Sequence, residues 1–390
     1  MKKHGHNILG ESSSVPAGKL IKKPRIAVLG AGHGGLAMAG HLAIMGFDVN
    51  LFNRNEERIW GIKISGGIEL QGEVEGFGRV RMCTTVMKDA IEDADLIMIV
   101  VPAYAHRWMA EEAAPHLKDG QIIILHPGRT FGALEFRQVL NEKKIKTDVI
   151  IAEAQTFIYA SRVIGPGQVQ IFRIKNSIPV ASVRAYLIPQ VLKKLANVYP
   201  QFVPGDNIFK TSFDNIGSVF HPSICVLNAG WIEDDSEFEF YREGVTVSVA
   251  RVLERIDRER IAVAEALGIR AMSALQWLYI AYNTTGVNLY EAIRKNPGYR
   301  GIKAPSTLRM RYIEEDVPCS LVPIASVGKM FGIKTPAINT IINLACILNN
   351  NDYWAEGRTV QQLGIDKMSL RELRLLAIGE QVKRTGNRKK

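Results

Sequence analysis

Cysteine is scarce in this chain, and its spacing excludes two common roles. The 390 residues include four cysteines and no Cys-x-x-Cys pair: Cys83, Cys225, Cys319 and Cys346. The spacing fits neither a zinc-binding pattern nor the dense disulfide framework of small secreted domains. We therefore expect free thiols in a reducing compartment and no metal ion.

The chain also lacks any long apolar run. The densest one, Leu96 to Val101, covers six residues, whereas a helix that spans a bilayer needs about 20. The N-terminal residues have no continuous apolar core of the signal-peptide kind. The sequence thus predicts no membrane association, and we expect a cytoplasmic protein.

An excess of positive charge is missing from the body of the chain, although the formal net charge is +10. Residues 1–24 hold five lysines against one glutamate, and residues 379–390 hold five basic residues against one glutamate. The two ends therefore carry eight of the ten charges. Because the remainder is nearly neutral, we expect no nucleic-acid partner.

Length and a change of pattern along the chain predict two domains, since 390 residues exceed one ordinary hydrophobic core. Residues 1–23 show no periodicity and predict a flexible N-terminal segment. In residues 24–204 short apolar runs alternate with helical patterns, which predicts an α/β domain with a doubly wound parallel sheet. In residues 205–390 helical patterns dominate, which predicts an all-α domain with a basic C-terminal tail.

Apolar periodicity places the individual elements. Strands are expected at Arg25–Leu29, Asp48–Phe52, Leu96–Val101, Gln121–Leu125 and Val149–Ala152. Helices are expected at Leu36–Met45, Met87–Ala94, His106–His116, Leu134–Leu140, Val249–Leu267 and Ile338–Leu348. The apolar stripe of Val249–Leu267 indicates core or a dimer interface rather than a ligand site.

A glycine-rich segment, GAGHGG from Gly30 to Gly35, follows the first predicted strand and opens the first predicted helix. In this context Gly30 permits the tight turn, Gly32 lets a pyrophosphate approach the backbone, and Gly35 allows the helix to pack on the strand. His33 and Gly34 share the loop, where the helix N-terminus favours phosphate. The segment predicts a Rossmann-type dinucleotide-binding domain; a plain glycine-rich turn is the alternative.

The second strand ends at Asn53 and Arg54. NAD sites usually place an acid there to hold the ribose 2′-hydroxyl, whereas a guanidinium suits a 2′-phosphate. We therefore predict a preference for NADP(H), with NAD(H) also accepted. The alternative is that Arg54 stacks on the adenine or faces solvent. Pro102, which closes the Leu96–Val101 run, is expected beside the same cofactor.

Four segments in the second half carry a family resemblance: NIGSVFHP at 215–222, FYREG at 240–244, IDRER at 256–260 and RYIEEDVP at 311–318. Together with the glycine loop they resemble the octopine/nopaline (opine) dehydrogenase family over about residues 25–350. The resemblance implies NAD(P)H-dependent reduction of the imine formed from an amino acid and a 2-oxo acid. It also implies a dinucleotide-binding domain followed by a helical domain, as the chain pattern predicts.

The resemblance assigns roles to four residues. His221 corresponds to the acid/base of the family, and Asp316 to the carboxylate that orients it. Arg311 corresponds to an arginine that holds a substrate carboxylate, and Thr156 to a threonine near the oxo acid. These residue types suit the chemistry, because histidine titrates near neutral pH and a guanidinium binds carboxylate through two hydrogen bonds.

One position departs from the family pattern. The family loop often reads Pro-Gly-Gln, whereas this chain has Pro127, Gly128 and Arg129. We expect Arg129 to contact the substrate, where it would favour an oxo acid with an additional carboxylate.

Two other functions stay open at this point. One is an oxo-acid reductase of the ketopantoate reductase or glycerol-3-phosphate dehydrogenase type, which needs no amine and typically uses a lysine. The other is a dinucleotide-sensing protein without turnover. We expect an amino acid and a 2-oxo acid as the small-molecule partners, and a homodimer.

Overall fold

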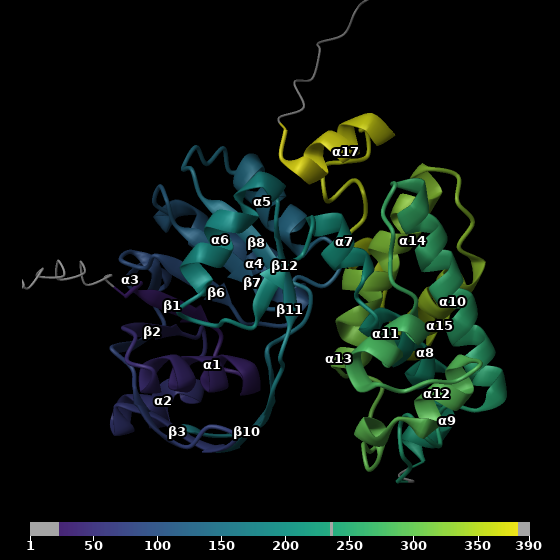
Figure 1. Ribbon diagram of the computed structural model, residues 1–390, viewed down its shortest axis with the longest axis horizontal. Helices are drawn as coiled ribbons and strands as arrows, with labels where there is room; N and C mark the ends of the chain where they lie inside the picture. Colours follow the sequence, from purple (N-terminus) through teal and green to yellow (C-terminus); the bar gives the residue numbers. More distant parts are fainter. Residues whose placement is uncertain (1–22, 235–236, 381–390) are drawn as a thin grey trace, which may run out of the picture.

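The computed structural model describes residues 23–234 and 237–380, which form two lobes joined along one side (Figure 1). The flexible segment predicted at residues 1–23 falls outside these ranges apart from Lys23, and so does the end of the basic tail beyond residue 380. The first lobe holds the strands and the second is helical, as the sequence predicts.

An eight-stranded sheet forms the centre of the first lobe. Its order is β12-β11-β8-β7-β6-β1-β2-β5. The strands are β1 (Ile26–Leu29), β2 (Val49–Phe52), β5 (Met82–Thr84), β6 (Leu96–Ile99), β7 (Ile122–Leu125), β8 (Ile150–Ala154), β11 (Ile178–Ser182) and β12 (Phe202–Pro204). Neighbouring strands are parallel except β8 and β11. The doubly wound α/β prediction is thereby confirmed.

The central strands are apolar throughout because both faces of the sheet are covered. Ala27 and Leu29 of β1 enter one hydrophobic cluster, and Ile26 and Val28 enter another. The helices of this lobe are α1 (His33–Ile44), α2 (Glu57–Ser65), α3 (Met87–Ile91), α4 (His106–Ala113), α5 (Gly132–Glu142) and α6 (Ile188–Leu195).

A second sheet covers α1, and it was not among the predicted elements. Its order is β4-β3-β10-β9, from β3 (Gly67–Gly72), β4 (Gly76–Arg79), β9 (Tyr159–Gly165) and β10 (Gln168–Ile174). Contact with α1 is close: a Cβ on Gly78 would lie 2.2 Å from the carbonyl oxygen of Gly40. The strands escape a periodicity search because β4 is glycine-rich and mostly exposed.

Helices make up the second lobe. They are α7 (Ile208–Phe213), α8 (Gly217–Leu227), α9 (Ala229–Glu233), α10 (Val247–Ala266), α11 (Ala274–Tyr282), α12 (Leu289–Lys295), α13 (Arg311–Glu314), α14 (Val322–Met330), α15 (Pro336–Asn349), α16 (Tyr353–Glu356) and α17 (Leu370–Ile378). A short π-helix, η5 (Val317–Leu321), connects α13 to α14. In α10, Val249, Ile256 and Val263 are buried, so the predicted stripe faces the core. None of the helices within the described ranges is long and apolar enough to cross a membrane.

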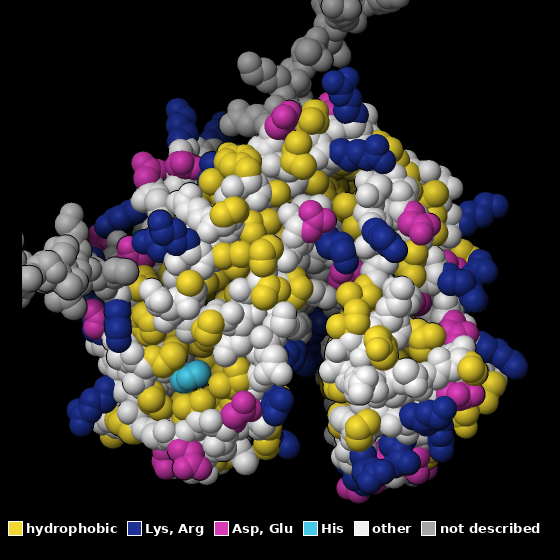
Figure 2. All heavy atoms as spheres, viewed as in Figure 1, with side chains coloured by type: hydrophobic (Ala, Val, Ile, Leu, Met, Phe, Trp, Pro, Cys, Tyr) yellow, Lys and Arg dark blue, Asp and Glu magenta, His cyan; other side chains and the backbone are white. Residues whose placement is uncertain are grey.

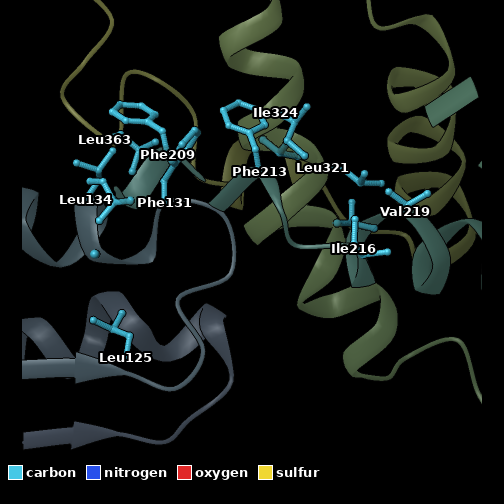
Figure 3. Close-up of a cluster of buried hydrophobic side chains, with 14 of the residues drawn as sticks. Leu125, Phe131, Leu134, Phe209, Phe213, Ile216, Val219, Leu321, Ile324 and Leu363 are labelled. Carbon is cyan, nitrogen blue, oxygen red and sulfur yellow. The ribbon is translucent and has the colours of Figure 1, made fainter. Parts of the chain in front are cut away.

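One apolar cluster continues from the sheet lobe into the helical lobe (Figure 3). The ring of Phe131, just before α5, lies 5.6 Å from the rings of both Phe209 and Phe213 on α7. Ile216 and Leu321 extend the cluster toward α8 and η5. The helix α7 packs against segments that precede residue 204 in the chain and against segments that follow it, so the exact domain boundary stays a prediction. The shared core fixes α8 and η5 relative to the sheet.

Candidate active site

The glycine loop lies at the carboxyl end of β1, where the strand order reverses between β2 and β6. Gly30 has a φ of +119°, and a Cβ on Gly35 would lie 1.8 Å from its carbonyl oxygen. A Cβ on Gly34 would lie 2.6 Å from the ring of Phe157. A Cβ on Gly32 would meet nothing within 4 Å. The open space over Gly32, at the N-terminus of α1, suits a pyrophosphate.

His33 is the first residue of α1, and its ring is tied to the second sheet. The backbone N–H of Val163 donates to its Nδ1 at 2.8 Å. Burial and then the charges of Arg162 and Arg311 lower the pKa of His33. Nδ1 therefore acts as an acceptor, which leaves a donor on Nε2 for a ligand in the loop.

Asn53 and Arg54 follow β2, as predicted. Asn53 Oδ1 accepts a hydrogen bond from the backbone N–H of Ala31 at 3.1 Å, so it braces the glycine loop. The guanidinium of Arg54 lies over the ring of Trp108, 5.6 Å from its centre. The edge of the sheet beside the loop thus presents a cation on an aromatic ring, with an amide where NAD sites carry an acid.

Pro102 follows β6 and precedes a 3-10 turn, η1 (Ala103–Ala105). The backbone N–H of Ala103 donates to Oε1 of Glu315 at 2.8 Å. The loop after β6 therefore contacts the helical lobe directly, beside the glycine loop.

The two predicted catalytic residues are hydrogen-bonded to each other. His221 lies on α8, and its Nδ1 is 2.8 Å from Oδ2 of Asp316, which is fully buried. Burial would raise the pKa of Asp316, but the charge of Arg129 and the hydrogen bond with His221 outweigh it and hold the pKa below its ordinary value. Asp316 is therefore an ionised acceptor, and Nδ1 of His221 donates to it.

The other ring nitrogen of His221 faces Tyr241. Its Nε2 is 3.1 Å from the Tyr241 hydroxyl. Burial raises the pKa of Tyr241 well above its ordinary value, so its O–H stays protonated and donates to Nε2. The ring of Tyr312 is stacked on that of His221 at 4.2 Å between centres. These contacts fix both the tautomer and the plane of the imidazole.

Arg129 lies behind this pair rather than in open space. Its Nη2 is 2.7 Å from Oε2 of Glu315, and its Nη1 is 3.3 Å from Oδ1 of Asp316. The side chain is 11% exposed. Two carboxylates thus already hold the guanidinium, and the predicted contact of Arg129 with the substrate stays a prediction.

Arg311 and Thr156 are placed on opposite lobes. Arg311 opens α13, is 58% exposed, and lies 3.7 Å from Oε2 of Glu315 through its Nε. Its positive charge lowers the pKa of His33 in the glycine loop, so Arg311 lies on the side of the helical lobe that faces the sheet lobe. Figure 2 shows a notch between the two lobes. Thr156 follows β8, and its Oγ1 accepts a hydrogen bond from Lys175 at 2.6 Å.

Arg358, which no sequence motif indicated, is a fully buried arginine at the lobe interface. It follows α16, is 1% exposed, and pairs with Glu135 of α5 at 2.8 Å. Its other nitrogens donate to the carbonyl oxygens of Gly128, Thr130 and Ala103 at 3.2, 3.2 and 2.7 Å. Arg358 thus ties together the two loops that carry Arg129 and Pro102.

Other functional candidates were also missed at the level of the sequence. Glu315, Tyr241 and Tyr312 lie inside the quoted family segments, so the segments were found without the roles of these residues. Lys175 belongs to no motif, and its setting depends on the second sheet. A cavity of about 840 Å³ between α14 and α15, lined by Lys329 and Trp354, contains none of the predicted site residues. Within residues 23–234 and 237–380, no three His, Cys, Asp or Glu side chains are grouped as metal ligands.

Two family models match this chain. The α-helical domain of NAD/NADP octopine/nopaline dehydrogenase matches residues 204–349. The NAD-binding domain of 6-phosphogluconate dehydrogenase matches residues 25–146.

Individual relatives match over nearly the whole length. An opine dehydrogenase of Arthrobacter sp. (strain 1C) is 36% identical over 356 residues, covering 91% of this chain and 99% of the relative. A structure of octopine dehydrogenase with NADH and L-arginine has a TM-score of 0.78 at 20% identity, covering 93% and 99%. A structure of yersinopine dehydrogenase with NADP+ has a TM-score of 0.74 at 15% identity, covering 90% and 99%.

Proposed function

Since this chain belongs to the octopine/nopaline (opine) dehydrogenase family and is an NAD(P)-dependent oxidoreductase that reductively condenses an amino acid with a 2-oxo acid, we propose that His221 is its acid/base. The observation that carries this assignment is the 2.8 Å hydrogen bond from Nδ1 of His221 to the buried, ionised Asp316. A carboxylate in that position stabilises the imidazolium that forms during proton transfer.

The residues of the first lobe fit a dinucleotide. Gly32 leaves space at the N-terminus of α1, and Asn53 braces the loop through Ala31. We assign the pyrophosphate to the segment from Gly30 to Gly35, with Pro102 bordering it after β6. When bound, the nicotinamide ring supplies the hydride, and the protein supplies position and charge.

Proton transfer falls to His221. The amine nitrogen of the amino acid adds to the 2-oxo carbon, and the resulting carbinolamine loses water to give an imine. Nε2 of His221, which faces the Tyr241 hydroxyl at 3.1 Å, takes a proton from the amine nitrogen once that nitrogen has added, and returns it to the departing hydroxyl, which leaves as water. Asp316 holds the positive charge of the ring through Nδ1 while it lasts.

Arg311 and Thr156 are proposed to bind the substrates. Arg311 is exposed enough to meet a carboxylate and has only a long contact of 3.7 Å to Glu315. Thr156 offers a hydroxyl at the end of β8. Arg129, whose side chain is 11% exposed, is proposed to contact the substrate as well.

NADP(H) is the proposed preference. The observation that supports it is Arg54, whose guanidinium lies over Trp108 beside the glycine loop with no acid at positions 53 and 54. A guanidinium there complements a 2′-phosphate. Among the similar structures, octopine dehydrogenase holds NADH and yersinopine dehydrogenase holds NADP+, so the fold accommodates either.

A cytoplasmic location and a homodimer belong to the same proposal. All four cysteines are free thiols, as proteins of a reducing compartment have. Most oligomers of soluble proteins are symmetric, and a twofold pair is the commonest. Sedimentation equilibrium checks the homodimer directly.

The test is oxidation of NADPH at 340 nm with pyruvate or 2-oxoglutarate, each with and without a pool of amino acids. Reductive condensation requires turnover only when both components are present. Turnover with an oxo acid alone would instead indicate a reductase of the ketopantoate type. Cofactor binding without turnover across the panel would indicate a dinucleotide sensor.

A further inference from the structure

Lys175 is a partly buried lysine with no carboxylate partner among the described residues. It directly follows β10, and its backbone N–H donates to the carbonyl oxygen of Ile158 at 2.9 Å. Its Nζ donates to Oγ1 of Thr156 at 2.6 Å. Among the described residues, no carboxylate lies within 4.0 Å of this ammonium, whereas Lys210 on α7 is paired with Asp214.

The environment of Lys175 is short of negative charge. Burial, and then the positive charge of Arg129, lower its pKa to about 8. An ammonium that is partly withdrawn from water without a counterion is costly, which favours the binding of an anion beside it. The partner that this environment lacks is an anion.

The location relates Lys175 to the reacting groups. Thr156 follows Gln155, whose side chain donates to the carbonyl oxygen of Asp214 at 3.1 Å, just before α8 and His221. Arg129, which acts on Lys175, is also 3.3 Å from Asp316. The ammonium therefore belongs to the sheet side of the cleft between the two lobes, and His221 to the helical side.

The hydrogen bond to Thr156 adds a second donor. Because Oγ1 accepts from Lys175, the hydroxyl hydrogen of Thr156 is directed away from the ammonium. An anion beside Nζ would receive one hydrogen bond from Lys175 and one from Thr156. A carboxylate has two oxygens for such a pair of donors.

We propose that Lys175 binds the carboxylate of the 2-oxo acid together with Thr156, and so determines which of the two substrates enters the sheet side of the cleft. This proposal rests on the proposed function. It leaves Arg311, on the opposite side, for the carboxylate of the amino acid.

Three variants test the assignment: Lys175→Met removes the charge, Lys175→Arg keeps it, and Lys194→Met on α6 is the matched surface control. Lys175→Met should raise KM for pyruvate by about 10- to 100-fold, as loss of a charge-assisted hydrogen bond does. The amino-acid KM should change less than threefold. Lys175→Arg should recover most of the affinity, and Lys194→Met should match the wild type. Thermal unfolding verifies that each variant is folded.

The pH dependence of KM distinguishes binding of the substrate by the charge of Lys175 from a role of Lys175 in proton transfer. In the wild type, KM for pyruvate should rise above about pH 8, where Lys175 loses its proton. Arginine stays charged throughout this range, so the rise should be absent in Lys175→Arg. A Lys175→Arg variant with normal KM and a kcat as low as that of Lys175→Met would make Lys175 an acid/base and overturn the proposal.

Oxamate, an unreactive analogue of pyruvate, distinguishes failure of this proposal from failure of the proposed function. Its dissociation constant from the enzyme–NADPH complex is measured by calorimetry. Weaker binding to Lys175→Met than to the wild type supports the proposal even if no substrate pair turns over. Binding that is equal in both, or absent from both, overturns it. Absence of amine-dependent turnover in the wild type counts against the proposed function alone.

Discussion

Arg129 and Asp316 form a buried ion pair at the lobe interface, with Nη1 of the arginine 3.3 Å from Oδ1 of the carboxylate. The other carboxylate oxygen, Oδ2, accepts the hydrogen bond from His221. Asp316 thus lies between the guanidinium of Arg129 and the imidazole of His221. Its charge is kept by Arg129 even when His221 is neutral, which prepares the pair for proton transfer.

Replacing Arg129 should therefore change the pH profile of the reaction. In Arg129→Met the pKa of Asp316 should rise, because the arginine is the main group that lowers it against burial. Activity would then be lost at a higher pH on the acid side, and kcat at pH 7 should fall by about tenfold or more. The measurement is kcat against pH from 5 to 9. Arg107→Met, an exposed arginine of α4, is the control. An acid limb at the wild-type position in Arg129→Met would contradict this role.

Cofactor selectivity should depend on Arg54. Arg54→Asp would place an acid where the ribose 2′-hydroxyl of NADH lies and would repel a 2′-phosphate. We expect the ratio of kcat/KM for NADPH over NADH to fall by about 10- to 100-fold, measured with saturating substrates. Arg173→Ala, an exposed position on β10, should leave the ratio unchanged. Equal specificity for both cofactors in the wild type would remove the basis of the NADP preference.

Arg358 should contribute to stability more than any surface ion pair. Arg358→Met leaves Glu135 buried without its cation, a change that costs about 3–5 kcal/mol in the free energy of unfolding. Urea denaturation measures the loss. The double variant Arg358→Met/Glu135→Leu should recover part of it, because no unpaired charge remains. Lys295→Met, at an exposed pair with Glu291, should cost less than about 0.5 kcal/mol. A similar loss for both single variants would be inconsistent with the interface role.

Two buried histidines should make the protein sensitive to acid. Burial lowers the pKa of His126 to about 3, and burial followed by the charge of Arg358 lowers that of His106 well below its ordinary value. In the unfolded chain both have a pKa of about 6.5. Below that pH the unfolded state binds protons that the folded state does not, so the free energy of unfolding decreases as the pH is lowered.

Each histidine should contribute a slope of about 1.4 kcal/mol per pH unit below pH 6. For His126 the loss continues down to about pH 3. The free energy of unfolding in urea, measured between pH 7 and pH 5, gives the slope. His126→Leu should reduce this slope by the contribution of about one proton. An unchanged slope in that variant would show that His126 is already protonated in the folded state.

The sequence predicted much of the fold because its strongest patterns are local. The buried strands β1, β6 and β7 are continuous apolar runs, and the glycine loop is set by backbone geometry that few residues permit. The second sheet was missed because its pairing of β3 with β10 joins segments about 100 residues apart. No local period records such a pairing.

The candidate site likewise combines residues that a local sequence motif indicates with residues whose role depends on long-range packing. His221 and Asp316 were found through a family resemblance, and the structure brings their side chains into contact. The environment of Lys175 and the insertion of Arg358 depend on packing between segments far apart in sequence, for which a single sequence has no signal. Arg129 was predicted to meet the substrate, and the structure reveals its pairing with Glu315 and Asp316.

The most direct test of the account is amine-dependent oxidation of NADPH by the wild type, His221→Ala and the control His116→Ala, with NADPH affinity measured by fluorescence. His116 ends a short turn after α4, outside the site. His221→Ala is expected to lose about 10²- to 10⁴-fold in kcat, while its NADPH affinity and the activity of His116→Ala remain at wild-type values. Undiminished turnover in His221→Ala would contradict the assignment of His221 as the acid/base.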